Sequence, residues 1–220
     1  MSKRPVRDRL AEAAFALFEE RGYDGTTVDH IAERAGVGRT TFFRAFPTKE
    51  DVIFPDHAAV LDRIRARLAT STEETSLVAV SEAARLVLGY YLSEGDLARS
   101  RYRLTSSVPA LRDREITSLQ QYQRVFRDFI RRWMGDDLRG ELRADLLATA
   151  VVTAHNYVLR RWLRGFTGAP EHEFDLAMGE VINLFGDRRA EGGGGTSVVV
   201  IRSSNDLETV VARVREALAP

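Results

Sequence analysis

Residues 26–46 read TTVDHIAERAGVGRTTFFRAF, and this stretch decides the fold of the first part of the chain. Thr26 or Thr27 can cap a helix, because a threonine hydroxyl accepts a hydrogen bond from a free amide of the first turn. Small apolar residues then recur at helical spacing: Val28, Ile31, Ala32 and Ala35. Gly36 stands where a chain that leaves a helix often needs a positive φ. The pattern predicts a short helix that ends in a glycine turn.

A second short helix is predicted after this turn. Phe42 and Phe46 are four residues apart and can anchor one face of it inward. The other face carries side chains that can bond to DNA base edges or phosphates: Arg39, Thr40, Thr41 and Arg44. Two such helices are typical of a helix-turn-helix, whose second helix enters the DNA major groove. An ordinary helical hairpin with solvated charges fits the same periodicity, so the flanking segments have to separate the two.

The flanking segments favour a DNA-binding head. Residues 7–21 predict an amphipathic helix that ends at Gly22, and Thr48 is a good cap for a further helix. Three helices around one apolar centre would make a compact head, which we place at residues 1–49.

The segment from about Arg7 to Phe54 also holds a distinctive series of residues in a distinctive order: Ala14, Leu17, Phe18, Gly22, Tyr23, Thr26, Thr27, Val28, Ile31, Ala32, Ala35, Gly36, Val37, Thr41, Phe42, Phe43, Phe46, Lys49 and Glu50. In this order and spacing the segment resembles the DNA-binding domain of the TetR family of bacterial transcriptional regulators. The resemblance implies a sequence-specific DNA-binding protein.

The resemblance implies DNA contacts for seven residues: Thr27, Arg39, Thr40, Thr41, Phe43, Arg44 and Lys49. Thr27 corresponds to a threonine that holds a phosphate at a helix N-terminus, where the helix dipole favours an anion. Lys49 corresponds to a lysine that contacts phosphate at the start of the fourth helix. Phe43 stands where the family commonly has a tyrosine with a phosphate-bonding hydroxyl, so Arg44 would supply positive charge there instead.

The rest of the chain predicts a larger helical domain at residues 50–190, so the expected fold class is all-α. We expect helices over these ranges: 48–69, interrupted at Pro55, then 77–93, 97–107, 109–135, 142–166 and 173–185. In the TetR family the last two long helices pack against their twofold mates. The resemblance therefore implies a homodimer through residues 142–185, which suits a palindromic double-stranded DNA operator.

The helical domain should also hold any small-molecule effector. The candidate effector-binding residues are Tyr91, Tyr102, Phe126, His155 and Asn156, and further aromatic candidates are Tyr90, Trp133, Tyr157 and Trp162. His155 also fits a satisfied interior or interface histidine, and most of the aromatics fit an ordinary core. Arg101 and Arg103 could bind an acidic effector, although a solvated face fits them better.

Composition agrees with a regulator and argues against other classes. The net charge is zero and there is no cysteine, which excludes thiol chemistry. Residues 1–7 lack an apolar run, and no stretch approaches the roughly 20 apolar residues that span a membrane, so we expect a cytoplasmic protein without a membrane partner. The four histidines show no metal-ligand spacing, and no catalytic motif occurs. We therefore expect no catalytic residue, no metal site and no cofactor.

An unusual segment follows at residues 191–220. Four glycines, residues 192–195, predict a flexible linker. The β-branched run at residues 197–202 predicts a strand, and residues 206–218 predict a helix with one apolar face. A lone strand has unpaired edges, so it needs its dimer mate, the body of the chain or another protein as a partner.

These patterns together predict a ligand-responsive repressor that binds a palindromic operator as a dimer. An activator of the same fold is the alternative, and an all-α enzyme or interaction module is a more distant one.

The roles assigned to Arg39 and Lys49 predict two different losses. Arg39→Ala should relax the preference for individual bases, because arginine reads guanine edges. Lys49→Ala should weaken binding about equally on all sequences, because a phosphate contact carries no sequence information. Gel-shift titrations on an operator and its single-base variants measure both effects. An identical loss of specificity in the two variants would contradict the assignment.

Overall fold

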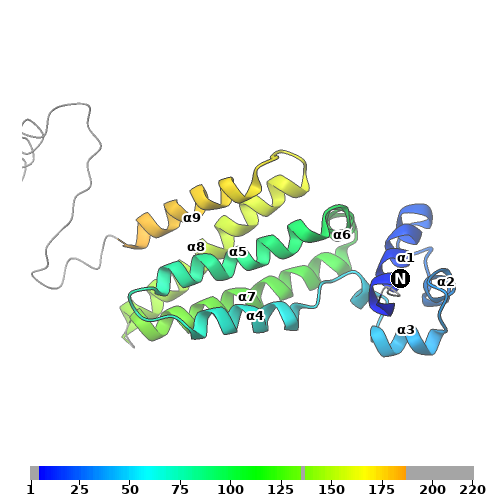
Figure 1. Ribbon diagram of the computed structural model, residues 1–220, viewed down its shortest axis with the longest axis horizontal. Helices are drawn as coiled ribbons and strands as arrows, with labels where there is room; N and C mark the ends of the chain where they lie inside the picture. Colours follow the sequence, from blue (N-terminus) through cyan, green and yellow to red (C-terminus); the bar gives the residue numbers. More distant parts are fainter. Residues whose placement is uncertain (1–4, 135–136, 187–220) are drawn as a thin grey trace, which may run out of the picture. The chain divides into compact units, whose positions relative to one another are not determined.

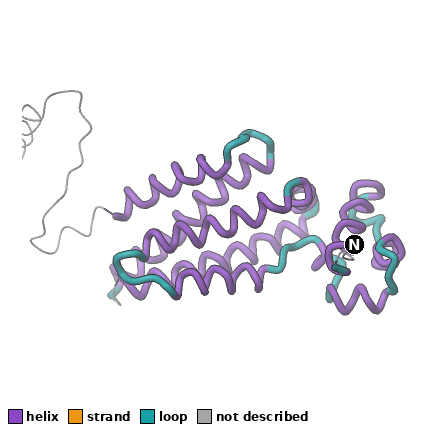
Figure 2. The backbone as a smooth tube through the Cα atoms, viewed as in Figure 1, coloured by secondary structure: helices purple, strands orange, loops and turns teal. Residues whose placement is uncertain are grey.

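Three short helices begin the fold in the computed structural model, which describes residues 5–134 and 137–186 (Figure 1). They are α1 (Val6–Arg21), α2 (Val28–Arg34) and α3 (Arg39–Ala45). The predicted helix-turn-helix is therefore present, with α2 and α3 as its two helices. Figure 2 shows only helices and loops in the described ranges, which agrees with the predicted all-α fold class.

A capping box at its start and a glycine turn after its end define the helix α2. The Thr27 hydroxyl accepts from the His30 amide at 3.2 Å, and His30 Nδ1 accepts from the Thr27 amide at 3.4 Å. This reciprocal pair is a capping box in which histidine takes the place of the usual Glu or Gln. Thr26 is instead fully buried, and its hydroxyl lies within donating distance of the Gly22 carbonyl at 2.8 Å and the Leu17 carbonyl at 3.2 Å. At the other end Gly36 has a φ of 65°, which leads the chain into the turn.

The head has its own apolar core. Its buried members are Leu10, Ala13, Ala14, Phe15, Leu17, Phe18, Ile31, Ala32, Ala35, Phe42, Phe46, Val52, Ile53, Phe54 and Leu111. Phe42 and Phe46 are buried as the spacing predicts. Leu111 comes from a much later helix and is fully buried here, so the body contributes directly to the core of the head.

The segment after α3 breaks where the proline predicts. A 3₁₀ turn, η1 (Glu50–Val52), comes first, and α4 (His57–Ala69) begins only after Pro55. Asp56 caps α4, because its carboxylate accepts from the Ala59 amide at 3.1 Å. Val52, Ile53 and Phe54 follow the predicted domain boundary at residue 49 but belong to the head core. The boundary itself stays a prediction.

Five further helices make the body together with α4. They are α5 (Ser76–Glu94), α6 (Asp96–Ser107), α7 (Pro109–Met134), α8 (Leu138–Leu163) and α9 (Pro170–Gly186). Figure 1 shows α4, α5, α7, α8 and α9 running roughly alongside one another, with the short α6 at one end of them. The largest fully buried side chains between them include Ile64, Val80, Leu88, Leu147, Val158 and Phe174.

Two helices of the body, α8 and α9, begin three or four residues earlier than the sequence-based expectation. α8 begins at Leu138 instead of residue 142, because the Asp137 carboxylate caps it by accepting from the Gly140 amide at 2.8 Å. α9 begins at Pro170 instead of residue 173, since proline is favoured in the first turn of a helix. The predicted linker, strand and helix of residues 191–220 lie outside the described residues, as does the boundary at residue 190.

A buried ion pair stands at the corner between α5 and α6. Gly95 turns the chain there with a φ of 56°. The Arg101 guanidinium donates to both carboxylate oxygens of Glu94, at 2.5 and 2.8 Å, and Arg101 Nε donates to the Ile53 carbonyl. The solvated face expected for Arg101 is therefore wrong, because a carboxylate and a backbone carbonyl satisfy its charge inside the protein. Arg103 is exposed, as expected, and pairs with Glu19 at 2.7 Å.

Removing Glu94 should be far more damaging than removing an exposed partner. The side chains of Arg101 and Glu94 are only 7% and 15% exposed, so Glu94→Ala leaves a buried charge unpaired. We expect a loss of about 3–5 kcal/mol in the free energy of unfolding. Glu82→Ala, which breaks the exposed pair with Arg67, should cost less than about 1 kcal/mol. Urea unfolding measures both, and equal losses would contradict the buried role of Glu94.

Candidate DNA-binding surface and ligand cavity

The outward face of α3 gathers most of the predicted DNA-contacting residues. Arg39, Thr40, Phe43 and Arg44 are exposed, and Thr41 is half-buried. Phe42 between them packs into the head core, so its burial fixes which side of α3 faces solvent. The face presents two guanidinium groups and hydroxyl groups, which are donors suited to base edges and phosphates.

Arg39 is held in place by neighbours from both helices of the motif. Its guanidinium forms an ion pair with Asp29 of α2 at 2.6 Å and lies 5.2 Å from the ring centre of Phe43. Both side chains of the ion pair are well exposed to solvent. An exposed pair of this kind is weak, so a DNA group can replace Asp29 at small cost.

Lys49 is more enclosed than its predicted role suggests. Its ammonium donates to the carbonyls of Tyr23 and Thr26 at 3.0 and 3.1 Å and lies 3.9 Å from the Tyr23 ring centre. The Tyr23 hydroxyl in turn donates to Glu50. Lys49 thus fastens the loop between α1 and α2 to the start of η1, and one of its three donors is left for a phosphate.

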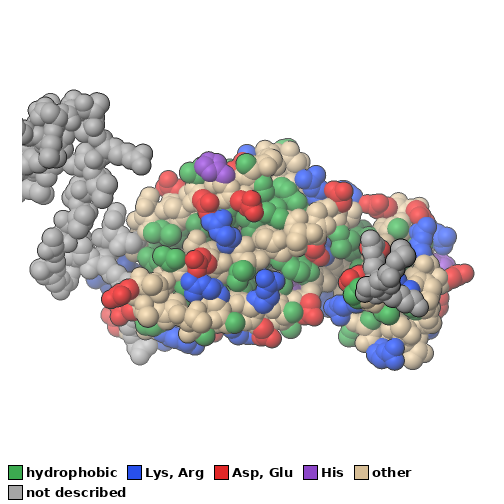
Figure 3. All heavy atoms as spheres, in the orientation of Figure 1, with side chains coloured by type: hydrophobic (Ala, Val, Ile, Leu, Met, Phe, Trp, Pro, Cys, Tyr) green, Lys and Arg blue, Asp and Glu red, His purple; other side chains and the backbone are tan. Residues whose placement is uncertain are grey.

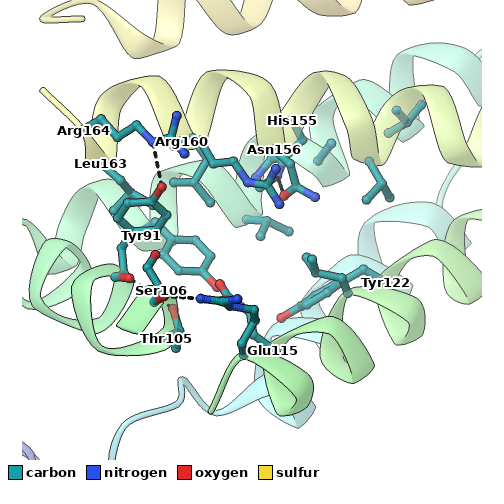
Figure 4. A pocket seen from close by; sticks show the side chains of 18 of the residues that line it. Tyr91, Thr105, Ser106, Glu115, Tyr122, His155, Asn156, Arg160, Leu163 and Arg164 are labelled. Carbon is teal, nitrogen blue, oxygen red and sulfur yellow. Dashed lines mark hydrogen bonds between the residues drawn. The ribbon is translucent and has the colours of Figure 1, made fainter. Parts of the chain in front are cut away.

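The body contains a cavity of about 390 Å³ between α5, α6, α7 and α8 (Figure 4). All five candidate effector residues line it: Tyr91 from α5, Tyr102 from α6, Phe126 from α7, and His155 and Asn156 from α8. Of the other aromatic candidates, Tyr157 lines a neighbouring hollow, and Trp162 lies in the body core. A volume of this size is within the range of small-molecule sites.

Sequence reasoning missed several lining residues, among them Arg112, Glu115, Tyr122, Arg160 and Arg164. The signal that could have found them is spacing. The α7 residues that line the cavity follow one another three or four apart: Arg112, Glu115, Leu119, Tyr122 and Phe126. That spacing defines one face of a helix.

The wall of the cavity touches the start of α4 through one hydrogen bond. The Tyr122 hydroxyl lies 2.8 Å from Nδ1 of His57, the first residue of α4. Burial lowers the pKa of His57 to about 4, and the charges of Arg101 and Arg114 lower it further. His57 is therefore neutral at pH 7, and Tyr122 can donate its proton to Nδ1.

His155 is neutral for a similar reason. Burial lowers its pKa to about 4, although a hydrogen bond with Asn156 Oδ1 at 3.2 Å acts in the opposite direction. Its ring also makes an edge contact with Phe174 of α9, with ring centres 6.3 Å apart. His155 supplies the cavity with a polar surface but no charge at pH 7.

Other kinds of site are not found in the part of the chain that the structure describes. Among residues 5–134 and 137–186, no three histidine or acidic side chains are grouped to hold a metal ion. In the same ranges, no helix combines the length and the apolar character that crossing a bilayer requires.

In comparison with known proteins, the head and the body match two different family descriptions. Residues 10–54 match the family of bacterial regulatory proteins called tetR, and residues 74–180 match the MftR C-terminal domain. The HTH-type transcriptional regulator TcmR of Streptomyces glaucescens is 30% identical over 166 residues, which cover 72% of this chain and 74% of TcmR. The chain belongs to the TetR family. It is a helix-turn-helix regulator of transcription, as the sequence predicts.

Further similarities agree with this family. MftR of Mycobacterium tuberculosis is 25% identical over 171 residues, covering 76% of this chain and 86% of MftR. Among solved structures, Thermus thermophilus FadR in complex with lauroyl-CoA has a TM-score of 0.52 at 23% identity, covering 86% of this chain and all of FadR. The SmeT–triclosan complex has a TM-score of 0.56 at 15% identity, covering 91% and 99%. These two structures share the fold.

The two buried histidines predict a loss of stability in mild acid. In the folded chain His57 and His155 have pKa values of about 4, whereas an unfolded histidine titrates near 6.5. Between these values the unfolded chain binds more protons, so the free energy of unfolding falls as the pH drops from about 6.5 to 4. The fall is at most roughly 1.4 kcal/mol per pH unit for each residue.

Urea unfolding at pH 7, 6 and 5 measures this dependence. His155→Leu should remove one residue's share of the slope, because leucine does not titrate. An unchanged slope in that variant would contradict the burial of a neutral His155.

Proposed function

We propose that this chain is a cytoplasmic repressor that binds a palindromic operator as a homodimer and leaves it when a small molecule occupies the cavity. The observation that carries the proposal is the hydrogen bond between Tyr122 in the cavity wall and His57 at the start of α4. A ligand that shifts Tyr122 acts directly on the helix that follows the DNA-binding head.

A second set of contacts also connects the cavity with the DNA-binding head. Tyr91 lines the cavity, and the guanidinium of Arg101 lies 5.9 Å from its ring centre. Arg101 also donates to the carbonyl of Ile53, which is part of the head core. A ligand changes DNA affinity only if it binds one arrangement of the head better than another, and these contacts give it a means to do so. FadR with lauroyl-CoA and SmeT with triclosan are proteins of this fold with bound small molecules.

The exposed surface of α8 and α9 supports a homodimer. Large apolar side chains stand in solvent on these two helices: Leu138, Leu142, Leu146, Tyr157, Leu176 and Leu184. Figure 3 shows apolar side chains reaching the surface of the body among charged ones. A set of this size marks an interaction surface more often than a free one. A twofold dimer would bury it and carry two α3 helices to two half-sites of an operator.

Gel-shift titration tests operator binding. We expect the full chain to retard DNA from upstream of its own gene, with an affinity that falls steeply as salt rises, because phosphate contacts release counterions. A scrambled duplex of the same composition is the control. Equal affinity for the two duplexes would contradict sequence-specific binding. Deleting the gene should raise transcription from that DNA, whereas a fall would indicate the alternative, an activator.

A charge on α9 tests the dimer. Leu176 is 59% exposed, so Leu176→Glu should leave the fold of each protomer intact and place a carboxylate in the proposed interface. We expect sedimentation to show half the mass and operator affinity to fall at least about tenfold, since half-sites then bind separately. Val78→Glu on α5, where Val78 is 53% exposed, is the matched control and should change neither. A dimeric Leu176→Glu variant would rule out this interface.

A further inference from the structure

The lining of the cavity changes from apolar inside to charged at its opening. Buried residues form the inner wall, and most are apolar: Ala84, Val87, Phe126, Val151 and Leu159. The exposed lining residues are Ser106, Arg112, Arg160 and Arg164, which mark the side open to solvent. In a ligand that fills this space, the inner end therefore lies against apolar side chains and the outer end lies near charged ones.

The charges at the opening are mostly positive. Arg112, Arg160 and Arg164 face a single carboxylate, Glu115, and Figure 4 shows Arg160 and Arg164 extending from α8 on the side opposite Glu115 and Tyr122. Three guanidinium groups and one carboxylate leave an excess of positive charge. A cationic ligand is disfavoured there, and an anionic one is attracted.

One of these arginines is available to a ligand. Arg112 donates to the Ser106 carbonyl, and Arg164 donates to the Tyr102 hydroxyl at 2.7 Å. Arg161, the neighbour on α8, pairs with Glu173 at 2.9 Å. The Arg160 side chain, in contrast, makes no hydrogen bond or ion pair with any residue in the described part of the chain, although its backbone carbonyl accepts from the Arg164 amide within α8. Each of the other two guanidinium groups gives up one of its five donors to the protein, so among the described residues that of Arg160 is the least committed at the opening.

The inner polar groups cannot take this role. The Tyr122 hydroxyl is engaged with His57. His155 Nδ1 is engaged with Asn156 Oδ1, so Nε2 of the neutral ring, which has no partner among the described residues, is an acceptor and cannot donate to an anion. A tyrosine hydroxyl carries no positive charge, and His155 is neutral at pH 7 because burial lowers its pKa to about 4. A negative charge placed deep in the cavity would have no cation to pair with, so it would be costly there.

We propose that the cavity takes an elongated apolar molecule with one terminal carboxylate or comparable anion, whose apolar part lies along Phe126 and Val151 and whose anion binds Arg160. This inference rests on the proposed ligand-binding function of the cavity and adds the chemical class of the ligand. The volume of 390 Å³ equals that of about 13 water molecules in the liquid, at about 30 Å³ each. It suits a molecule with on the order of 13 non-hydrogen atoms.

Three probes that share a straight ten-carbon chain and differ in charge test the proposal: decanoate, 1-decanol and decyltrimethylammonium, all below the concentrations at which they form micelles or separate from water. Isothermal titration of the full chain should show decanoate binding at least about tenfold more tightly than either of the others, because a charged hydrogen bond at a solvent-facing site contributes about that factor. Equal binding of the three, tighter binding of the cation, or no binding of decanoate would overturn the proposal.

Two variants on α8 locate the anion. Arg160→Gln should weaken decanoate about tenfold and leave 1-decanol within twofold, since it removes the cation and keeps the apolar wall. Arg139→Gln is the matched control, because Arg139 is an exposed arginine on α8 outside the cavity, and it should change neither. Equal weakening of decanoate by both variants, or none by Arg160→Gln, would overturn the assignment.

Gel shifts with the upstream DNA on the same preparations distinguish a wrong ligand class from a wrong function. If DNA is bound but the three probes are not distinguished, the ligand class is wrong and the regulator stands. If the wild-type chain does not prefer the upstream DNA, the proposed function itself fails.

Discussion

The rest of the structure depends on one buried guanidinium, that of Arg101. A positive charge this far from water is tolerated only when its hydrogen bonds are satisfied, and Glu94 and the Ile53 carbonyl satisfy them. This requirement holds the α5–α6 corner and the segment after α3 in one arrangement. Leu111 acts at the same junction from the apolar side, because it is fully buried in the core of the head. The helix-turn-helix is therefore joined to the body by packing as well as by the chain.

The cavity is in contact with this junction. Tyr91 and Tyr122 line it, and each contacts a group that belongs to the junction or to the start of α4. Only two side chains separate a ligand in the cavity from the head core: Tyr91 and then Arg101, which bonds to the Ile53 carbonyl. Short contacts of this kind transmit a displacement without large rearrangement of the body, which is consistent with the close packing of protein interiors.

Much of the head could be predicted from sequence, because its determinants are local. Gly36 ends α2, and the four-residue spacing of Phe42 and Phe46 sets the inward face of α3. Contacts between distant residues could not be predicted in this way. The periodicity of α6 gives no sign that Arg101 is buried, since its partners lie 7 and 48 residues away. The cavity was predicted in part, because aromatic and amide side chains stand out in a helix, whereas Arg160 looks like any solvated arginine until the fold places it at an opening.

The ion pair between Asp29 and Arg39 has a consequence for how the head meets DNA. Affinity for arbitrary DNA grows with the number of phosphates that a protein neutralises. While Asp29 holds Arg39, one of the two arginines on α3 is already neutralised and adds little to such contacts. A guanine edge and a phosphate can each accept two parallel hydrogen bonds from a guanidinium, so either would have to displace the Asp29 carboxylate to bind Arg39 in this way. Any contact between the Arg39 guanidinium and DNA therefore begins with an exchange of partners, in which the Asp29 carboxylate gives up its cation.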